Sequence, residues 1–294
     1  MSASNPIGFI GLGVMGEPIC RNLLKKSGRP VVAFDLAKEP LARMQNDGAR
    51  VAPSIAAVIQ QADVVFYCLP SGKHVRSLFE DHGGVLEHVR AGQTIVDLGT
   101  SPVGLTRELA MRVEAKGASF ADAPIARTRE AAINGTLSVM VGATPELFAK
   151  IEPLIRHFAT EVTNCGGTGA GQVTKILNNM VLFQTVNALC EAAGIARRSG
   201  VDPKLLFETL SKGSADSFAL RNHGLKAVIP GEFPERAFST EYALKDLSYA
   251  LDLAKDIDLD VPGAELAGEV LQKAIDAGFG GAYWPVIAKV VDRS

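Results

Sequence analysis

The chain has 294 residues, 47% of them hydrophobic, and its 30 Lys and Arg nearly balance its 32 Asp and Glu. This length and composition suffice for two domains with large cores, whereas the net charge of −2 provides no basic surface for nucleic acid or an anionic membrane. Because no apolar stretch is long enough to span a bilayer and the N-terminus lacks the pattern of a signal peptide, we expect a cytoplasmic protein.

The first predicted unit is a strand, a glycine-rich turn and a helix. An apolar run, Ile7–Ile10, leads into Gly11-Leu12-Gly13-Val14-Met15-Gly16, and a helix is expected from Met15 to Lys26. In this GxGxxG spacing the first glycine permits a tight turn, the second lets the backbone approach a pyrophosphate, and the third lets the helix pack on its strand. The phosphates would then lie on N–H groups at the helix N-terminus. We therefore expect a dinucleotide to contact Gly11, Gly13, Val14, Met15 and Gly16.

The second predicted strand, Val31–Phe34, ends at an acidic residue, Asp35. A carboxylate at the end of this strand can accept hydrogen bonds from both ribose hydroxyls of an adenosine, and it repels a 2′-phosphate. The cofactor is therefore predicted to be NAD rather than NADP. A glycine-rich turn in an ordinary strand–helix unit is the alternative, but the strand, the helix and the acid together favour a dinucleotide site.

Strand-like and helical stretches alternate over a little more than half of the chain. Beyond the first two units, apolar strands are expected at Val64–Cys68, Thr94–Leu98, Ser119–Asp122, Leu137–Val141 and Val162–Cys165. Continuous apolar strands separated by helices are typical of a parallel sheet with both faces covered. The fold class is therefore predicted to be α/β, with an N-terminal Rossmann domain built on a doubly wound parallel sheet.

The rest of the chain is predicted to be helical. Helices are expected at 170–199, 203–211, 216–228, 241–257 and 262–277. We place the domain boundary after Gly166, with a dinucleotide-binding Rossmann domain at 1–166 and an all-α substrate and dimerisation domain at 167–294. Because ligands of doubly wound sheets bind at the carboxyl ends of the strands, the helical domain is expected to close over that edge.

Cysteine and histidine residues show no metal-ligand spacing. The four cysteines are scattered without a CxxC motif or a Cys/His cluster, at Cys20, Cys68, Cys165 and Cys190. This pattern is typical of reduced, buried thiols rather than of a disulfide or zinc framework. The five histidines are equally scattered, so we predict that the protein binds no metal.

The longest predicted helix carries two polar residues among apolar ones. Lys175 and Asn179 lie four residues apart, hence on one face, in a helix that is apolar on nearly all sides. Such a helix is predicted to be buried. A buried ammonium has a lowered pKa and can exchange a proton near neutral pH, so Lys175 is a candidate general acid and base. The alternative is a lysine that extends to the surface or pairs with a buried acid.

Several motifs, in order along the chain, resemble those of the 6-phosphogluconate dehydrogenase-like β-hydroxyacid dehydrogenases, which include 3-hydroxyisobutyrate dehydrogenase. They cover essentially the full length and are Gly8–Gly16, Leu69-Pro70, Asp122-Ala123-Pro124, the glycine-rich entry to Lys175 with Asn178 and Asn179, and Leu244–Leu247. The resemblance implies that Lys175 is the catalytic lysine and that Asn179 is its partner or contacts the substrate. It also implies cofactor contacts at Leu69, Pro70, Thr100 and Lys245, and substrate contacts at Asn178, Asn179 and Asp246, the last of which braces Lys245.

One loop departs from the family pattern. Where the family usually reads Asp-Ala-Pro-Val-Ser-Gly-Gly, this chain reads Asp122-Ala123-Pro124-Ile125-Ala126-Arg127-Thr128, and an Arg-Thr pair at this place resembles family members that reduce sulfolactaldehyde. Arg127 offers a planar fork for two oxygens of a carboxylate or sulfonate, and Thr128 precedes a short helix expected through Ile133. We expect both to bind the distal anion of the substrate. Alternatively, Arg127 is solvated or pairs with Glu130, and Arg129 is a weaker candidate for the anchor.

Together these residues predict an NAD-dependent β-hydroxyacid dehydrogenase that transfers hydride between nicotinamide and a small anionic acid carrying a primary alcohol or aldehyde, similar to 3-hydroxyisobutyrate. A sulfolactaldehyde or succinic semialdehyde reductase, with Arg127 as the anion anchor, is the alternative. An imine-reducing relative is disfavoured because such relatives generally replace the lysine. A non-catalytic dinucleotide-binding module is disfavoured by the balanced charge and by Lys175. The apolar helical domain predicts a homo-oligomer, either a dimer or a tetramer.

Overall fold

The computed structural model describes residues 5–235 and 237–292, and the chain divides into two compact units, Met1–Lys175 and Ile176–Ser294. The division falls within the long helix α9 (Ala170–Arg198), which begins in the first unit and continues in the second. In the described residues, no helix is both long enough and apolar enough to cross a membrane.

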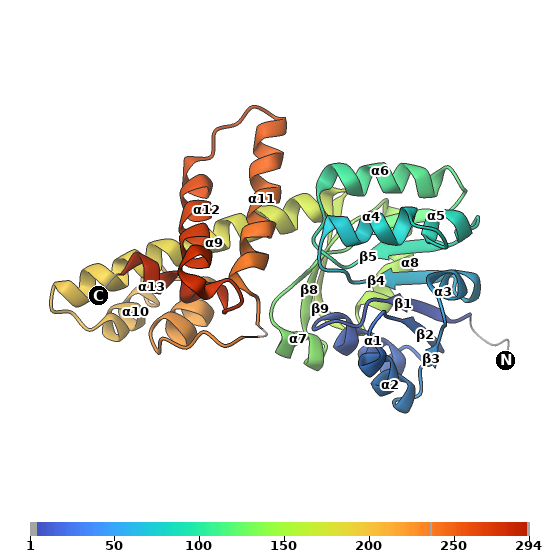
Figure 1. Cartoon of the computed structure of the whole chain (residues 1–294), viewed down its shortest axis with the longest axis horizontal. Helices are drawn as coiled ribbons and strands as arrows, with labels where there is room; N and C mark the ends of the chain where they lie inside the picture. The colour runs from blue at the N-terminus through green and yellow to red at the C-terminus, as the bar shows by residue number, and fades with distance from the viewer. Residues whose placement is uncertain (1–4, 236, 293–294) are drawn as a thin grey trace. The chain divides into compact units, whose positions relative to one another are not determined.

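A single sheet forms the centre of the first unit (Figure 1). Six neighbouring parallel strands, in the order β3-β2-β1-β4-β5-β6, are β1 (Ile7–Ile10), β2 (Val31–Phe34), β3 (Arg50–Val51), β4 (Val64–Tyr67), β5 (Thr94–Asp97) and β6 (Ser119–Asp122). The strand order reverses at β1, which lies between β2 and β4. Doubly wound sheets bind ligands at the carboxyl ends of the strands at such a reversal. The predicted fold class is therefore confirmed.

The sheet is not parallel throughout. β8 (Leu137–Gly142) runs antiparallel to β6 and to the short strand β7 (Ile125–Ala126), and β9 (Ala159–Gly166) pairs with β8 in parallel. The prediction of a parallel sheet is therefore wrong at β8. The apolar pattern shows that this strand is buried but not which way it runs. Its direction follows from the link after β6, which β7 and α7 (Arg129–Asn134) occupy instead of a full crossover helix.

Helices cover both faces of the sheet because successive strand residues point to opposite faces. Ile7 and Phe9 of β1 belong to the core on one face, and Ile10 belongs to the core on the other. The first face packs against α7, α1 (Gly16–Lys26), α2 (Lys38–Asn46) and α8 (Pro145–Ile155). The second face packs against α3 (Ile55–Gln61), α4 (Gly72–Glu80), α5 (Val85–His88) and α6 (Val103–Glu114).

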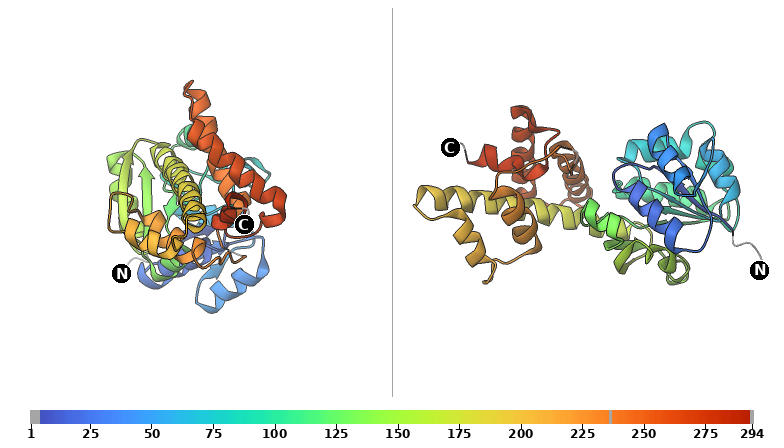
Figure 2. Two further views of the ribbon diagram at one scale, coloured as in Figure 1. Left: turned by 90° about the vertical axis from the view of Figure 1, so that its left-hand side faces the viewer. Right: turned by 90° about the horizontal axis from the view of Figure 1, so that it is seen from below.

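The second unit is built of helices, as predicted (Figure 2). After α9 come α10 (Pro203–Leu210), the π-helix η1 (Leu220–Val228), α11 (Thr240–Asp256), α12 (Pro262–Ala274), the π-helix η2 (Ile275–Phe279), the 3₁₀-helix η3 (Trp284–Ile287) and α13 (Ala288–Val291). The helix predicted at 216–228 begins at Phe218, and the hydroxyl of Ser217 just before it accepts the Leu220 N–H; its π-helical part begins at Leu220. α11 packs beside α12, and the rings of Phe183 and Trp284 meet edge to face.

Part of α9 is exposed, contrary to the prediction that this apolar helix is buried. Leu177 is 39% exposed, Val181 58% and Ile195 68%, whereas Ile176 and Val186 are fully buried. The helix therefore carries apolar side chains on its surface as well as in the core. Both sides of the helix carry apolar residues. Periodicity alone therefore does not show which side is buried against other helices of the chain and which side is exposed.

Candidate active site

The glycine-rich turn after β1 leaves space where a pyrophosphate would lie. Gly11 has a φ of 90°, and a Cβ there or on Gly16 would collide with a backbone carbonyl oxygen, of Cys68 and of Gly11 respectively. A Cβ on Gly13, by contrast, would meet no atom within 4 Å. Among the described residues, no side chain caps the N-terminus of α1. The turn therefore fits a phosphate close to Gly13 that accepts hydrogen bonds from N–H groups at the start of the helix.

Asp35 follows β2 and is fixed beside this turn. Its Oδ2 accepts a hydrogen bond of 2.5 Å from the N–H of Leu12, and its Oδ1 accepts one of 2.7 Å from the N–H of Ala37. Each carboxylate oxygen offers two lone pairs, so both can still accept hydrogen bonds from ribose hydroxyls. The residues present thus fit a dinucleotide from its phosphates to its adenosine ribose.

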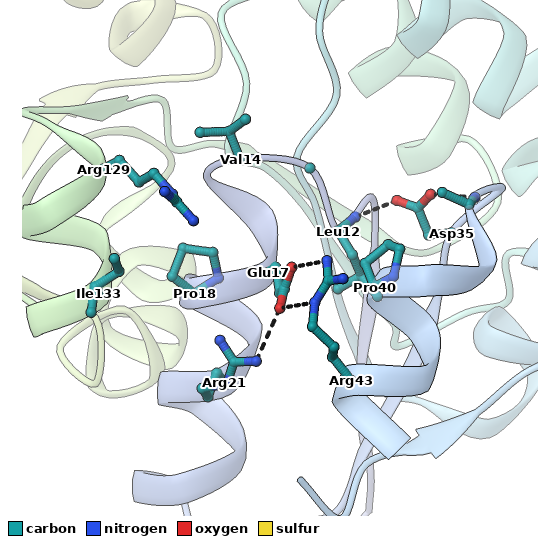
Figure 3. A pocket seen from close by; sticks show the side chains of 12 residues that line it. Leu12, Val14, Glu17, Pro18, Arg21, Asp35, Pro40, Arg43, Arg129 and Ile133 are labelled. Atoms are coloured by element: carbon teal, nitrogen blue, oxygen red, sulfur yellow. Dashed lines mark hydrogen bonds and ion pairs between the residues drawn. The ribbon is translucent and has the colours of Figure 1, made fainter. Parts of the chain in front are cut away.

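A cavity of about 470 Å³ opens beside the turn (Figure 3). The turn, the end of β2 and charged side chains from α1, α2 and α7 form its wall. Figure 3 shows Glu17 of α1 between Arg21 and Arg43, both of which donate hydrogen bonds to its carboxylate, while Arg129 of α7 also lines the cavity. Glu17 and Arg43 are not among the site residues predicted from the sequence. The available signal was the spacing of Glu17 and Arg21, which lie four residues apart on one helix face.

The ends of β4 and β5 bring three further predicted contacts together. Leu69 and Pro70 follow β4, and Thr100 follows β5, its parallel neighbour. The two loops lie close to each other, since a Cβ on Gly99 would be 2.9 Å from the carbonyl oxygen of Leu69. Thr100 is buried and Pro70 is exposed. All three residues therefore lie at the carboxyl edge of the sheet, beside the glycine-rich turn that follows β1.

Two buried carboxylates at this edge attach the start of α9 to the sheet. Asp97 ends β5 and Asp122 ends β6, and both side chains are inaccessible to solvent. Asp122 accepts the backbone N–H groups of Gly169 at 2.6 Å and of Gln172 at 2.7 Å. The side-chain oxygen of Gln172 accepts the N–H of Ser101 at 3.0 Å. The first turn of α9 is therefore tied to the ends of two neighbouring strands.

Burial shifts the titration of both carboxylates. It raises the pKa of Asp97 to about 7, although the N–H of Gly99 and the hydroxyl of Ser101 donate to the carboxylate and act in the opposite direction. Burial also raises the pKa of Asp122, against the backbone N–H groups that it binds. Asp97 is not among the site residues predicted from the sequence. The unused signal was an acidic residue at the end of each of two adjacent buried strands.

Lys175 follows this attachment within one turn of α9. It lies three residues after Gln172 and is the last residue of the first unit. Its side chain is half-buried rather than enclosed, which corrects the sequence-based expectation. The reason is local, since Asn178, which lies three residues later on the same face of α9, is exposed.

Four predicted residues meet in the second unit. The side-chain nitrogen of Asn179 donates to Oδ2 of Asp246 at 2.8 Å, and both residues are 2% exposed. Oδ1 of Asp246 forms an ion pair of 2.8 Å with the ammonium of Lys245, which also lies 4.0 Å from the ring centroid of Tyr242. The exposed Asn178 donates to Oδ1 of Asn179 at 3.2 Å. Both oxygens of the buried Asp246 carboxylate thus have a partner, and Lys245 compensates its charge.

The loop that departs from the family pattern has an unusual backbone. Arg127 has a φ of 85°, a left-handed conformation that is uncommon for residues other than glycine. Its exposed side chain donates through Nη1 to the carbonyl oxygen of Thr136 at 2.6 Å and to the hydroxyl of Thr160 at 3.1 Å. Thr128 is the N-cap of α7, and its hydroxyl oxygen accepts the N–H of Ala131 at 3.4 Å. The hydroxyl proton of Thr128 is not used by the cap and can be donated elsewhere.

Cysteines and acidic side chains form no metal-like grouping in the described part of the chain. Within it, no three His, Cys, Asp or Glu residues come together as metal ligands would. The four cysteines are free thiols, of which Cys20 and Cys190 are buried.

Comparison with known proteins relates this geometry to a family. Residues 6–167 match the NAD binding domain of 6-phosphogluconate dehydrogenase, and residues 169–287 match the family described as NAD-binding of NADP-dependent 3-hydroxyisobutyrate dehydrogenase. All of this chain aligns with 97% of 2-(hydroxymethyl)glutarate dehydrogenase of Eubacterium barkeri, at 33% identity. The chain belongs to the β-hydroxyacid dehydrogenase family.

Two further relatives agree with membership of the β-hydroxyacid dehydrogenases. The mitochondrial 3-hydroxyisobutyrate dehydrogenase of Mus musculus is 32% identical, over 95% of this chain and 84% of its own length. The structure of Mycobacterium tuberculosis 3-hydroxyisobutyrate dehydrogenase with L-serine superposes with a TM-score of 0.89 at 28% identity, covering 98% of this chain and 99% of that one. This β-hydroxyacid dehydrogenase is therefore an oxidoreductase that uses a nicotinamide dinucleotide and acts on hydroxyl groups.

Proposed function

We propose that this β-hydroxyacid dehydrogenase catalyses reversible hydride transfer between NAD(H) and a small acid carrying a primary alcohol or the corresponding aldehyde, as in 3-hydroxyisobutyrate, with Lys175 as general acid and base. The observation that carries the proposal is the attachment of α9. Asp122 and Gln172 tie its first turn to the ends of β6 and β5, and Lys175 follows one turn later. This is the edge at which doubly wound sheets bind their ligands.

Lys175 provides the proton transfers in this proposal. When bound, the nicotinamide supplies the hydride for reduction and accepts it in oxidation. In reduction, the ammonium of Lys175 donates a proton to the aldehyde oxygen as that oxygen gains negative charge. In oxidation, the neutral amine of Lys175 removes the proton of the substrate hydroxyl. Oxidation should therefore become faster as the pH rises.

Asp35 supports a preference for NAD(H) over NADP(H). Two backbone N–H groups, those of Leu12 and Ala37, hold the carboxylate in place, so it cannot turn away from a 2′-phosphate at the ribose position. Like charges repel at such short range, whereas ribose hydroxyls donate hydrogen bonds to the same oxygens. The residues at the next two strand ends, Leu69, Pro70 and Thr100, are proposed to contact the nicotinamide side of the cofactor.

The cluster around Asp246 is proposed to orient the reacting groups. Because Asp246 binds Asn179 with one oxygen and Lys245 with the other, it fixes the direction of both side chains. We assign Asn179 and Asn178 to contact with the substrate, with Asn179 also orienting Lys175, which precedes it by four residues in α9. Lys245 is assigned to an anionic group of the cofactor or the substrate.

A second candidate substrate class carries a sulfonate or a more distant carboxylate, as in sulfolactaldehyde or succinic semialdehyde. The observation that favours it is the environment of Arg127, whose guanidinium contacts only neutral oxygens among the described residues and forms no ion pair with Glu130 there. Its charge is therefore not compensated by an acid of the described chain, and it can bind a substrate anion with Thr128.

We also propose that the protein is a cytoplasmic homo-oligomer. Exposed apolar side chains on two helices, Leu177, Val181 and Ile195 of α9 and Leu266 of α12, are typical of a surface that a second chain covers. The cytoplasmic location is inferred from the amino-acid sequence.

A panel of acid aldehydes with NADH tests the proposed function. Methylmalonate semialdehyde and tartronate semialdehyde represent the first substrate class, and succinic semialdehyde and sulfolactaldehyde represent the second. Preferred turnover of a member of the first class supports a 3-hydroxyisobutyrate-like activity, and preferred turnover of a member of the second supports the Arg127 anchor. Reduction of neutral aldehydes at rates equal to those of the acids would contradict both.

A further inference from the structure

Glu17 lines the cavity beside the glycine-rich turn, and its carboxylate binds two arginine side chains, those of Arg21 and Arg43 (Figure 3). Its side chain is 15% exposed, and both of its oxygens bind Arg43: Oε1 accepts Nε–H at 2.9 Å and Oε2 accepts Nη2–H at 2.7 Å. Oε1 also accepts Nη2–H of Arg21 at 3.0 Å. The hydrogen bond from Arg43 holds the pKa of Glu17 below its usual value, so the carboxylate is charged at neutral pH.

Arg43 lines the same cavity as the glycine-rich turn. It extends from α2, which begins shortly after Asp35, and it lines the same cavity as Gly13 and Asp35. In Rossmann domains that bind NADP, an arginine near the end of the second strand accommodates the 2′-phosphate. In this chain, one edge of the Arg43 guanidinium, formed by Nε and Nη2, is occupied by Glu17. A bidentate pair of this kind is strong and fixes the direction of the guanidinium.

We infer that Glu17 is a positioning residue for cofactor choice: by holding the guanidinium of Arg43, it withholds that cation from the 2′-phosphate of NADP(H). This inference rests on the proposed NAD preference of the same site and adds a second determinant to the repulsion by Asp35. Arg21 plays a smaller part, because Asp47 also accepts its Nε–H at 2.7 Å. Loss of the Glu17 carboxylate therefore leaves Arg21 bound to Asp47, whereas it frees the guanidinium of Arg43 from its bidentate pair.

The affinity of the 294-residue chain for NADPH and for NADH, measured by calorimetry without substrate, tests this inference. Glu17→Gln should bind NADPH about tenfold more tightly than the unmodified protein, the equivalent of one charged hydrogen bond, and should bind NADH within about twofold of it. Glu39→Gln is the matched control. It removes the same charge from the first turn of α2, but Glu39 acts on Arg43 through charge alone, so NADPH affinity should change by less than about twofold.

Two further variants isolate the contribution of Arg43. The double variant Glu17→Gln/Arg43→Gln should lose the gain in NADPH affinity. Arg43→Gln alone should bind NADPH no more tightly than the unmodified protein, because it removes the cation itself and leaves the Glu17 carboxylate in the cavity, and this result is informative even if Glu17→Gln does not fold. A gain of NADPH affinity in Arg43→Gln would contradict the inference, because the cation that Glu17 is inferred to withhold is then absent.

The inference is overturned if Glu17→Gln gives no gain in NADPH affinity, if Glu39→Gln gives the same gain, or if the gain survives the loss of Arg43. Equal affinity of the unmodified protein for NADPH and NADH has a different meaning. It would contradict the NAD preference proposed for Asp35, whereas the change from Glu17 to Gln would still measure the restraint on Arg43.

Discussion

The carboxylate of Asp122 accepts a hydrogen bond of 2.7 Å from the backbone N–H of Gln172 and so joins the end of β6 to the first turn of α9. Its other oxygen accepts the N–H of Gly169 at 2.6 Å. A negative charge at this position is favourable because the N–H groups at a helix N-terminus carry partial positive charge. The place of Lys175, one turn further along, therefore depends on a strand-end carboxylate as well as on the helix itself.

Asp122→Asn should impair catalysis through the position of Lys175. An asparagine keeps one acceptor oxygen and loses the charge, so the variant should be less stable by about 1–3 kcal/mol in urea unfolding. Its kcat should fall more than its KM changes, while NADH affinity is retained. Asp202→Ala, which removes a side-chain cap from α10, is the control and should cost about 1 kcal/mol without a change in kcat. An unchanged kcat in Asp122→Asn would refute the positioning role.

Asp97 should make the stability of the protein depend on pH. Burial raises its pKa from the ordinary 3.8 to about 7, so between these values the folded state binds a proton that the unfolded chain releases. This contribution to stability is full below about pH 4 and is lost as the pH rises through 7. A difference of about three pKa units corresponds to about 4 kcal/mol.

Asp97→Asn cannot ionise and should remove this pH dependence. Its unfolding free energy, measured in urea, should therefore rise relative to that of the unmodified protein between pH 4 and pH 8 by up to about 4 kcal/mol. A difference between the two proteins that stays constant with pH would show that Asp97 titrates normally.

The features that could be predicted from the sequence are those carried by local motifs. The GxGxxG turn, Asp35 and the apolar strands are recognisable because neighbouring residues carry the whole signal, and the structure has β1, α1 and β2 where they are predicted. The contacts of Asp122 and Gln172 could not be predicted in this way. They join residues 50 apart along the chain, and such pairs leave no periodic pattern.

The remaining differences concern direction and exposure. β8 has the apolar pattern of a buried strand in either direction, so its antiparallel course could not be read from residues 137–141. Leu177 and Val181 look like core residues, but this chain leaves them exposed, because burial depends on which element packs against a helix face and not on the face alone. The strand β7 has only two residues, too few to show a pattern.

Gly13 should be required for the cofactor and not for folding. A Cβ at this position meets no protein atom within 4 Å, so Gly13→Ala should change the unfolding free energy by no more than about 1 kcal/mol. Its dinucleotide affinity should fall about tenfold or more, because the methyl group takes the space of the pyrophosphate. Gly104→Ala in α6 also adds a Cβ to open space and should leave affinity unchanged. Equal affinity in Gly13→Ala would place the phosphates elsewhere.

Two variants of Arg127 separate the effect of its backbone conformation on stability from the effect of its side chain on substrate binding. Arg127→Ala and Arg127→Gly remove the same guanidinium, so both should raise KM for the preferred acid strongly and lower kcat less. Because the φ of 85° strains alanine but not glycine, Arg127→Gly should be about 1 kcal/mol more stable than Arg127→Ala. Calorimetric unfolding and steady-state kinetics measure the two effects. Normal KM values in both variants would move the anion anchor to another residue, such as Arg129.

Lys175→Ala provides the most direct measurement of the central claim, that Lys175 is the general acid and base. Turnover of the preferred acid aldehyde should fall by about two to four orders of magnitude, the range for loss of a general acid, while NADH affinity and thermal stability are retained. Lys212→Ala, at an exposed position, should keep normal turnover. If Lys175→Ala also turns over its substrate at close to the unmodified rate, Lys175 does not transfer the proton and the proposed mechanism is wrong.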